Sequence, residues 1–332
     1  MTAESLTSPA PRAGQWTAPA DPLTAITAAP ALVGLEELGV IAVSGDDAPK
    51  FLQGQLTNDV LELGERFTLN GYCTAKGRLI ATFGQWRDAE SIYLLLPREI
   101  LAAVLKRLSM FVLRAKVKLS DVSDPFACHG LVGHGAAALL EQAGITPPAT
   151  AWESVQAGDL RVARLPAAPG AAERFLLLGA LPAALAAQPL AAPGVWWWSE
   201  IDAAVPTVFA ATQEKFVPQM INLEVLGGVN FKKGCYPGQE IVARSQYLGK
   251  LRRRMAVAHV RAESVTAGAD VFAGADPVGT VVMAAAAPQG GFDLLFESPV
   301  DQQLENHLHL VAADGPLLAL RPLPYAIFDP TA

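Results

Sequence analysis

The order of apolar patterns between residues 40 and 119 constrains the fold of this chain most. Segments with strand character, the last of them alternating between apolar and polar side chains, are interrupted by two segments with apolar side chains at helical spacing, one around Phe51 and one from Ile100 to Leu108. The expected strands are residues 40–43, 67–74, 79–86, 91–96 and 112–119. A chain that changes repeatedly between these two periods predicts an α+β fold.

The chain is long enough to form more than one hydrophobic core, since it has 332 residues and 51% of them are hydrophobic. Residues 1–33 are rich in alanine, proline and threonine and lack periodicity, so we expect a disordered tail there. Subdomain boundaries are expected near residue 124, at a turn sequence, and near residue 200. Over residues 251–327, short strand patterns alternate with glycine and proline turns, which predicts a small β-barrel.

Residues 231–244, with the sequence FKKGCYPGQEIVAR, have the most distinctive local chemistry. Glycines on both sides of Cys235 permit a tight turn or a close approach to a ligand. Pro237 favours a helix whose first turn carries Gln239 and Glu240. The segment therefore predicts a turn followed by a short helix, with the cysteine just before the helix start.

Cys235 is expected to lie where positive potential favours the thiolate, because a helix N-terminus follows and Lys232 and Lys233 precede it. We therefore hypothesise that Cys235 is reactive, and that Lys233 orients an anionic group or lowers the pKa of the thiol. The alternative is that Cys235 packs as a small hydrophobic residue, as many free cysteines do.

Several segments resemble the YgfZ family. Residues 232–240, KKGCYPGQE, closely resemble its KGC(Y/F)xGQE motif. Members of that family are folate-binding relatives of the glycine-cleavage T-protein, an aminomethyltransferase, and they support iron–sulfur enzymes, including one that methylthiolates tRNA. Other segments match the family in order: residues 51–60 resemble its QGQxTxDV segment and residues 73–78 its CDAKG(K/R) segment, and residues 218–223 and 322–325 also match. The similarity thus extends over nearly the whole chain.

The resemblance implies a GcvT-like multi-domain arrangement in which residues 34–250 surround a central folate cavity. The implied cofactor is tetrahydrofolate or a derivative of it, and the residues expected to contact it are Trp196, Lys76, Asn58, Tyr236, Gln239 and Glu240. An aromatic ring such as that of Trp196 can stack on a flat pteridine, although large aromatic residues also serve simply as core.

The resemblance also implies a thiol function for Cys235, assisted by Lys233. A single thiolate can be one transient ligand of an iron–sulfur cluster, with the other ligands supplied by a partner or a small thiol. Gln239 and Glu240 would then fix the loop by hydrogen bonding; alternatively they are ordinary helix-start residues.

Two departures from the family pattern concern the folate pocket. Leu38 stands where some members have a second tryptophan, and residues 201–204 read IDAA where the family has IEAG. We therefore expect the pocket shape and the folate affinity to differ from those of other members.

Carboxylates bear on catalysis. T-proteins carry an aspartate in the first hairpin that assists aminomethyl transfer, whereas this chain has no Asp or Glu between Cys73 and Arg87. A general acid or base must reach the reacting group, so aminomethyltransferase activity is the weaker alternative, with Asp59 as the nearby carboxylate that could serve.

A cysteine-nucleophile enzyme is a further alternative. It needs a histidine base, and we expect all five histidines to be structural or on the surface: His129, His134, His259, His307 and His309.

Charge is distributed unevenly. The net charge is −7, yet residues 231–254 hold seven basic residues against Glu240 alone, so this segment is +6 and the rest of the chain is −13. Such a segment can attract a folate tail or a nucleic-acid phosphate. The alternative, which we favour for Arg252, Arg253 and Arg254, is a solvated strand edge.

The cysteines and the N-terminus indicate the compartment. Cys73, Cys128 and Cys235 are odd in number and widely spaced, which fits reduced thiols, and no CxxC pair indicates a zinc site or a permanent cluster. No run of eighteen apolar residues is free of polar or proline interruption, and the N-terminus lacks the order of a secretion signal. We therefore expect a cytoplasmic protein.

The resulting interpretation is a tetrahydrofolate-binding accessory protein that supports assembly or repair of iron–sulfur enzymes, including tRNA methylthiolation, without classical turnover. We expect folate and iron–sulfur enzymes or assembly proteins as its partners, and neither a membrane nor a directly bound nucleic acid.

Overall fold

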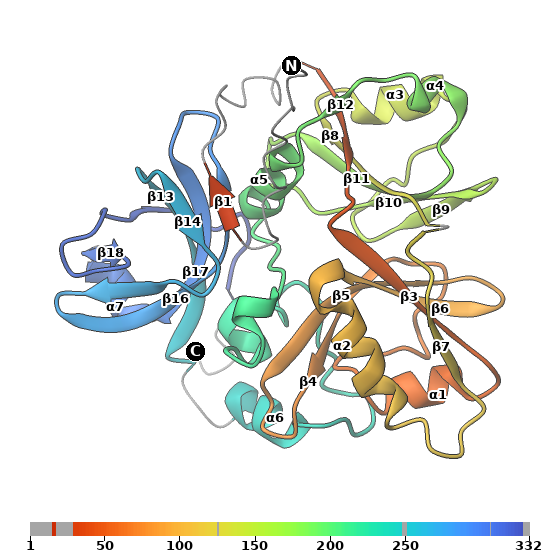
Figure 1. Cartoon of the computed structure of the whole chain (residues 1–332), viewed down its shortest axis with the longest axis horizontal. Helices are drawn as coiled ribbons and strands as arrows, with labels where there is room; N and C mark the ends of the chain where they lie inside the picture. Colours follow the sequence, from red (N-terminus) through yellow and green to blue (C-terminus); the bar gives the residue numbers. More distant parts are fainter. Residues whose placement is uncertain (1–14, 18–28, 125, 248–250, 306, 328–332) are drawn as a thin grey trace, which may run out of the picture.

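The computed structural model describes residues 15–17, 29–124, 126–247, 251–305 and 307–327. Three sheets surround helix α5 (Gly194–Asp202) in Figure 1: a C-terminal sheet on the left, a six-stranded sheet at the upper right and a five-stranded sheet at the lower right. The largest apolar core lies between the facing sides of these sheets, and α5 packs into it. None of the helices in these ranges is long and apolar enough to cross a membrane.

The five-stranded sheet is antiparallel, with strand order β4-β5-β6-β3-β7. Its strands are β3 (Leu38–Ser44), β4 (Thr68–Cys73), β5 (Leu79–Arg87), β6 (Ser91–Pro97) and β7 (Lys118–Asp121). Helices α1 (Ala48–Gln53) and α2 (Arg98–Ser109) share a second apolar core with one face of this sheet. The strands and helices expected between residues 40 and 109 are confirmed.

The strand expected at residues 112–119 is wrong for most of its length, because only Lys118–Asp121 forms β7. The chain between α2 and β7 makes successive tight turns, in which the backbone N–H of Val112 donates to Ser109 and that of Ala115 to Val112. Leu113 adopts a φ of 49°, in the left-handed region. Side chains in such turns can alternate in polarity as they do in a strand, so the pattern alone was misleading.

The six-stranded sheet has the order β12-β2-β8-β11-β10-β9 and is antiparallel except for the pair of β2 and β12. Its strands are β2 (Ala31–Gly34), β8 (Cys128–Gly133), β9 (Ser154–Ala157), β10 (Leu160–Arg164), β11 (Glu173–Gly179) and β12 (Leu190–Ala191). Helices α3 (Ala136–Gln142) and α4 (Ala183–Ala186) cover its outer face. Its inner face contributes to the central core.

Two segments of residues 1–33 are ordered, contrary to the expected disordered tail. Gln15–Thr17 forms β1 and pairs with β14 (Ser264–Thr266), while Ala31–Gly34 forms β2 and buries Leu32 and Val33. Both segments gain backbone hydrogen bonds from distant strands, which composition does not reveal. The remainder of that prediction, residues 1–14 and 18–28, lies outside the described residues.

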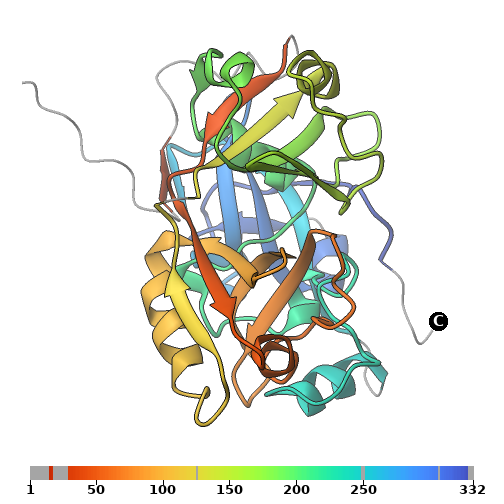
Figure 2. The same ribbon diagram turned by 90° about the vertical axis from the view of Figure 1, so that its right-hand side faces the viewer.

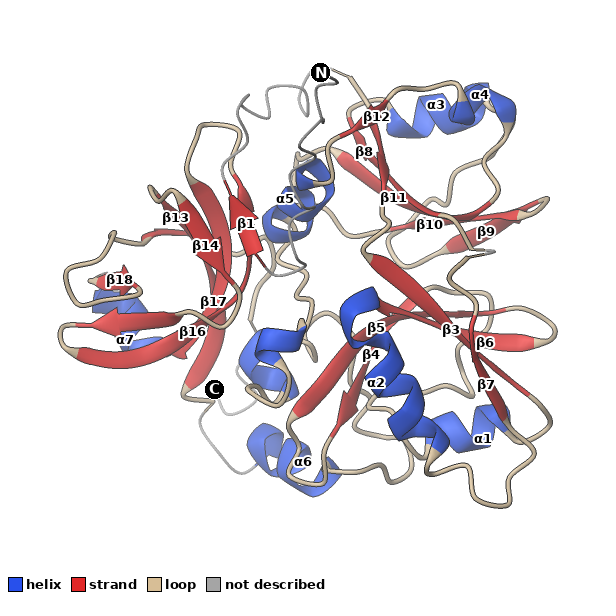
Figure 3. Cartoon of the chain, in the orientation of Figure 1, coloured by secondary structure: helices blue, strands red, loops and turns tan. Residues whose placement is uncertain are grey.

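The C-terminal sheet is a curled half-barrel with strand order β18-β15-β16-β17-β13-β19 (Figure 3). Its strands are β13 (Arg253–Val260), β15 (Asp270–Ala273), β16 (Asp276–Ala286), β17 (Phe292–Pro299), β18 (Leu308–Leu310) and β19 (Ala319–Arg321), and α7 (Val300–Glu305) follows β17. The expected small β-barrel is present as this curled sheet, and its end strand β18 is hydrogen-bonded to the chain just before β19: the Leu318 backbone N–H donates to the Leu308 carbonyl at 2.8 Å, and that of Leu310 to the Pro316 carbonyl at 2.9 Å.

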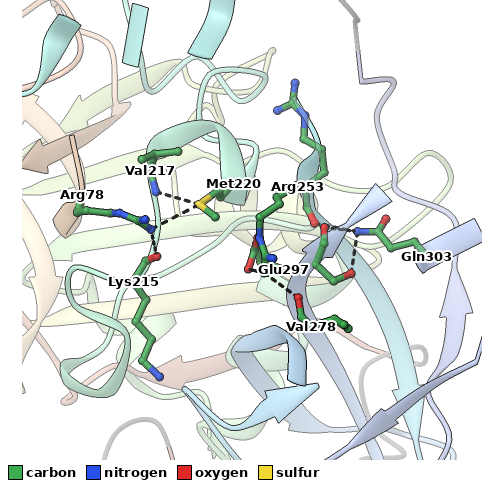
Figure 4. Close-up of polar contacts among 10 residues, drawn as sticks. Arg78, Lys215, Val217, Met220, Arg253, Val278, Glu297 and Gln303 are labelled. Carbon is green, nitrogen blue, oxygen red and sulfur yellow. Dashed lines mark hydrogen bonds and ion pairs between the residues drawn. The ribbon is translucent and has the colours of Figure 1, made fainter. Parts of the chain in front are cut away.

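Two of the three arginines that we expected at a solvated strand edge, Arg253 and Arg254, are instead paired with carboxylates. Arg252 is exposed, but Arg253 forms an ion pair with Glu297 on the neighbouring strand β17 (Figure 4). Arg254 is buried and forms an ion pair with the buried Glu224. Because β13 lies inside the sheet, between β17 and β19, both guanidinium groups reach carboxylates; the Arg254 side chain is buried, whereas that of Arg253 is 37% exposed.

Candidate functional site

Three of the segments that carry the family resemblance meet in space. The ammonium of Lys233 donates to the backbone carbonyls of Gln53 and Leu56, at 2.5 Å each. Thr57 is fully buried, and its hydroxyl donates to the Gly228 carbonyl at 2.7 Å. The chain from residue 227 to residue 241 is thus bound to the end of α1 and the turn that follows.

Asn58, a predicted folate contact, is part of this contact region between residues 227–241 and the end of α1, which we call the joint. Its side-chain amide donates to the carbonyls of Leu69, at 2.8 Å, and Gly227, at 2.7 Å, and its side-chain oxygen accepts from the Asp59 backbone at 2.9 Å. These contacts use the polar atoms of the side chain, so the structure gives Asn58 a connecting role.

Gly77 lies in the turn between β4 and β5, which form the first hairpin, and Gly238 lies in residues 231–238, which carry Cys235 and which we call the cysteine loop. The two glycines let the hairpin and the cysteine loop come into contact. Gly238 has a φ of 81°, and a Cβ placed there would lie 2.4 Å from the Thr74 carbonyl oxygen and 2.6 Å from Gly77 Cα. Only glycine permits this approach. Beside it, Arg78 donates to the Lys215 carbonyl at 2.5 Å and contacts Met220 Sδ at 3.8 Å (Figure 4), and Lys76 is exposed at the hairpin tip.

The cysteine loop exposes the thiol of Cys235. Tyr236 beside it is buried under Lys233, whose ammonium lies 5.0 Å from the ring centroid, and burial lowers the pKa of Lys233 to about 8. The groups that Lys233 contacts are therefore carbonyl oxygens and an aromatic ring, so it anchors the loop. Its effect on the pKa of the thiol stays a prediction.

Helix α6 (Gln239–Tyr247) begins where the sequence predicted, directly after Gly238. Gln239 makes a long hydrogen bond of 3.5 Å to the Lys233 carbonyl, and Glu240 is exposed and paired with Arg244 at 3.1 Å. Gln239 therefore helps to close the loop, while the contact of Glu240 is that of a surface helix residue.

We predict that a thiol reagent labels one cysteine per native chain at about pH 8. Burial raises the pKa of the Cys73 and Cys128 thiols to about 12, so both stay protonated, whereas Cys235 is exposed. Spectrophotometric titration with a disulfide reagent should detect Cys235 in the native protein and all three thiols in denaturant. Cys235→Ala should remove the native signal, and rapid native labelling of that variant would contradict the burial argument.

A second group of residues lines a cavity in the central core. Trp196 and Trp197 of α5 form one wall and Phe67 and Trp152 another, with the cavity between the five-stranded and six-stranded sheets. Trp196 is 2% exposed and packs on Gly130, where a Cβ would lie 2.1 Å from its ring. The cavity holds about 70 Å³.

One carboxylate lines this cavity, that of Glu200. It is buried and paired with Arg174, which also donates to Ser199 Oγ at 3.0 Å and lies over the Trp196 ring at 5.3 Å. Burial raises the pKa of Glu200, and the charge of Arg174 opposes that rise. Glu200 is a candidate site residue that no sequence motif indicated, although its spacing of four residues from Trp196 on one helix was a usable signal.

The predicted site residues thus fall into two groups. Trp196 lines the central cavity, whereas Lys76, Asn58, Tyr236, Gln239 and Glu240 belong to the joint around Cys235 and are not among the lining residues. Asp59, considered as a catalytic carboxylate, also lies outside the lining. Although its partial burial acts to raise its pKa, hydrogen bonds from the backbone of Glu62 and from Gln53 hold the pKa below its usual value.

Metal-binding chemistry is sparse. In the described ranges, no three histidine, cysteine, aspartate or glutamate side chains gather as they would around a metal ion. A cluster ligated through Cys235 would therefore need ligands from outside this group of residues.

Known proteins resemble the chain in sequence and in structure. It is 35% identical over 230 residues to "tRNA-modifying protein YgfZ" of Colwellia psychrerythraea strain 34H, covering 68% of this chain and 70% of that protein. It is 30% identical over 308 residues to the protein of the same name from Vibrio vulnificus strain CMCP6, covering 89% and 92%. The chain belongs to the YgfZ family. No protein-family model matches it.

The fold of this YgfZ family member is GcvT-like, as expected. The glycine cleavage system aminomethyltransferase T from Bartonella henselae superimposes with a TM-score of 0.70 at 17% identity, covering 89% of this chain and 86% of that one. At that identity the likeness concerns the fold alone. The resemblance inferred from the sequence motifs is thus confirmed for both the family and the architecture.

Proposed function

We propose that this YgfZ family member binds tetrahydrofolate in its central cavity and supports assembly or repair of iron–sulfur enzymes, including one that methylthiolates tRNA. The name of its relatives supports the link to tRNA modification, and the GcvT-like fold supports folate binding. Iron–sulfur enzymes or assembly proteins are the proposed partners, and the cytoplasm is the proposed location.

The observation that carries the proposal is the aromatic cavity with a single buried carboxylate. Trp196, Trp197 and Phe67 line the cavity with aromatic surface, and Glu200 can accept hydrogen bonds from the amino and N–H groups of a pterin. These side chains fit the chemistry of the ligand, which when bound would supply a carrier for one-carbon groups.

The size of the cavity sets a condition on binding. Its volume of about 70 Å³ is small beside the roughly 300–1,000 Å³ that is usual for ligand sites. Trp152 is half-buried at φ 70° and stacks on Phe67 with ring centroids 6.4 Å apart. We propose that this lining side chain turns aside when folate enters.

The exposed thiol of Cys235 is the proposed transient ligand of an iron–sulfur cluster. We predict that Cys235→Ala abolishes tRNA methylthiolation in cells that lack the endogenous protein, while tetrahydrofolate affinity stays within about twofold of wild type. Mass spectrometry of tRNA nucleosides and calorimetry measure the two effects. Cys128→Ala is the matched control, because that thiol is buried and we assign it no function. Full methylthiolation with Cys235→Ala would remove the thiol from the mechanism.

Aminomethyltransferase activity is the second candidate, and Glu200 is the observation that favours it. This carboxylate lines the cavity although the hairpin aspartate of T-proteins is absent. Its pairing with Arg174 opposes a role as a general base. Tetrahydrofolate-dependent release of ammonia from an aminomethyl donor would establish this activity, and binding without release supports the accessory role.

A cysteine-nucleophile enzyme has weaker support. Two of the five histidines are engaged in the C-terminal sheet: His259 pairs with Asp293 at 2.9 Å, and His309 hydrogen-bonds to the Gly315 carbonyl at 2.8 Å. Neither of these two histidines is therefore a candidate base for Cys235.

A further inference from the structure

The loop after α2 exposes large apolar side chains. The exposed fractions are 88% for Leu113, 59% for Met110 and 45% for Phe111. Single exposed apolar residues are ordinary, but three within four positions form a patch of the kind that marks a contact site.

Basic residues flank this patch along the chain, and one of them, Lys116, is paired with Asp46 at 3.2 Å. Residues 101–120 contain five of them and no Asp or Glu, so this segment is +5 and the rest of the chain is −12. The five are Lys106, Arg107, Arg114, Lys116 and Lys118. We call residues 106–118 the basic–apolar loop.

The basic–apolar loop has a fixed shape. Its turns are closed by backbone hydrogen bonds, and the Lys116 backbone N–H donates to the carboxylate of Asp47 at 2.8 Å. The left-handed φ of 49° at Leu113 is uncommon for leucine, and its side chain is almost fully exposed rather than packed inward. A preordered apolar surface loses little conformational freedom on binding, which favours association.

The loop lies at the same end of the molecule as the cysteine loop. Helix α1 connects them: Asp47, just before the helix, contacts Lys116, while Gln53 at its end accepts the hydrogen bond from Lys233. Six helical residues span only about 9 Å. Figures 1 and 2 both show the α2–β7 connection and α6 at the lower end of the molecule.

We propose that the basic–apolar loop docks a protein partner whose surface offers an apolar pocket bordered by Asp and Glu, and that docking places this partner beside Cys235. Met110 and Leu113 are the anchors that enter the pocket, and the exposed Lys106 and Arg114 face its acidic border. Apolar anchors with a charged rim are the usual composition of a protein–protein contact. The identification of the partner as an iron–sulfur enzyme rests on the proposed function.

A protein fits this surface better than RNA or a membrane. Aliphatic side chains gain little against phosphates, and single-stranded RNA is held by stacked aromatic rings, of which the loop has only the part-exposed Phe111. The charge of −12 outside the segment opposes approach to an anionic bilayer.

The test uses the full chain with Met110→Glu and Leu113→Glu combined. In cells lacking the endogenous protein, we expect tRNA methylthiolation to fall about tenfold or more, with tetrahydrofolate affinity and melting temperature unchanged. The affinity for a purified tRNA-methylthiolating iron–sulfur enzyme should be about tenfold lower for the variant than for wild type. High salt should lower the affinity of wild type for that enzyme by a similar factor. Leu304→Glu is the matched control, because this leucine is 82% exposed on α7 in the C-terminal region.

Several outcomes decide the proposal. Methylthiolation at the wild-type level in the double variant overturns it. An unmodified tRNA transcript and phosphatidylglycerol vesicles are the other probes; if wild type binds either one and the double variant does not, RNA or a membrane replaces the protein partner. If the double variant has a lower melting temperature, two other folded variants decide the matter: Met110→Ser combined with Leu113→Ser, and the charge reversal Arg114→Glu. Both must show the same loss of methylthiolation, or the proposal fails. Absence of folate binding in wild type, with the docking defect still present, refutes the proposed function and leaves the docking surface standing.

Discussion

Replacing Arg174 with methionine is expected to lower the free energy of unfolding by about 3–5 kcal/mol, because it leaves a buried carboxylate without its counter-charge. The Arg174 side chain is 3% exposed and that of Glu200 is 7% exposed. Arg174 also donates to the Pro166 carbonyl at 2.7 Å. Methionine keeps much of the length of the side chain, so the change removes charge and hydrogen bonds more than volume. Urea denaturation followed by circular dichroism measures the loss.

Acid should partly rescue this variant. Burial raises the pKa of Glu200 above its unfolded value, and loss of Arg174 raises it further. A carboxyl group with a raised folded pKa binds more protons when folded, so its penalty grows as pH rises from the unfolded pKa through the folded one. The deficit of Arg174→Met relative to wild type should therefore shrink as the pH falls toward about 4.5.

Arg164→Met is the matched control on the neighbouring strand. Arg164 pairs with Glu173 at 3.1 Å, but both side chains are 27% exposed, so water replaces much of the lost interaction. We expect a loss of about 1 kcal/mol or less. Equal losses for the two arginine variants would contradict the importance assigned to the buried pair.

Gly238→Ala is expected to cost about 2–5 kcal/mol, from a strained left-handed backbone and from overpacking against the first hairpin. The new methyl group would lie 2.4 Å from the Thr74 carbonyl oxygen, and that contact is between backbone segments that cannot simply rotate away. The loop that carries Cys235 would then separate from the hairpin. We therefore expect tRNA methylthiolation in cells to fall together with stability.

Gly234→Ala provides the comparison within the same loop. A Cβ at Gly234 meets no atom within 4 Å, and the residue precedes the same cysteine. Its stability should stay within about 0.5 kcal/mol of wild type. Thermal denaturation of both variants checks the pair, and a Gly238→Ala protein as stable as Gly234→Ala would show that the two motifs are not tightly joined.

Local periodicity predicted much of this fold from the sequence. The apolar repeat from Ile100 to Leu108 and the start of α6 after Pro237 depend on neighbouring residues alone, and both are present in the structure. The turns around Leu113 and the pairing of β1 with β14 depend on hydrogen bonds that a polarity pattern does not encode. Arg254 was placed at a solvated edge because its partner Glu224 lies thirty positions earlier in the chain.

The candidate site was predictable in the same uneven way. Motif resemblance indicated the segments around Asn58, Gly77 and Cys235, and the structure shows why they belong together: they pack on one another. The motif resemblance did not indicate that the polar atoms of the Asn58 side chain form hydrogen bonds within that packing. Glu200 was missed because a carboxylate acquires its position in a cavity only when α5 meets the two sheets.

The most direct test of the account is calorimetric titration of the full chain with tetrahydrofolate, comparing wild type with Trp196→Ala. We predict one binding site in wild type and an affinity lower by about tenfold or more in Trp196→Ala, because the ring that lines the cavity is lost. Trp198→Ala is the control, since the indole N–H of Trp198 donates a hydrogen bond to the carboxylate of Asp293 in the C-terminal sheet at 2.9 Å. Wild-type protein that binds no tetrahydrofolate, or equal affinity in wild type and a folded Trp196→Ala variant, would contradict the proposal that the central cavity is the folate site.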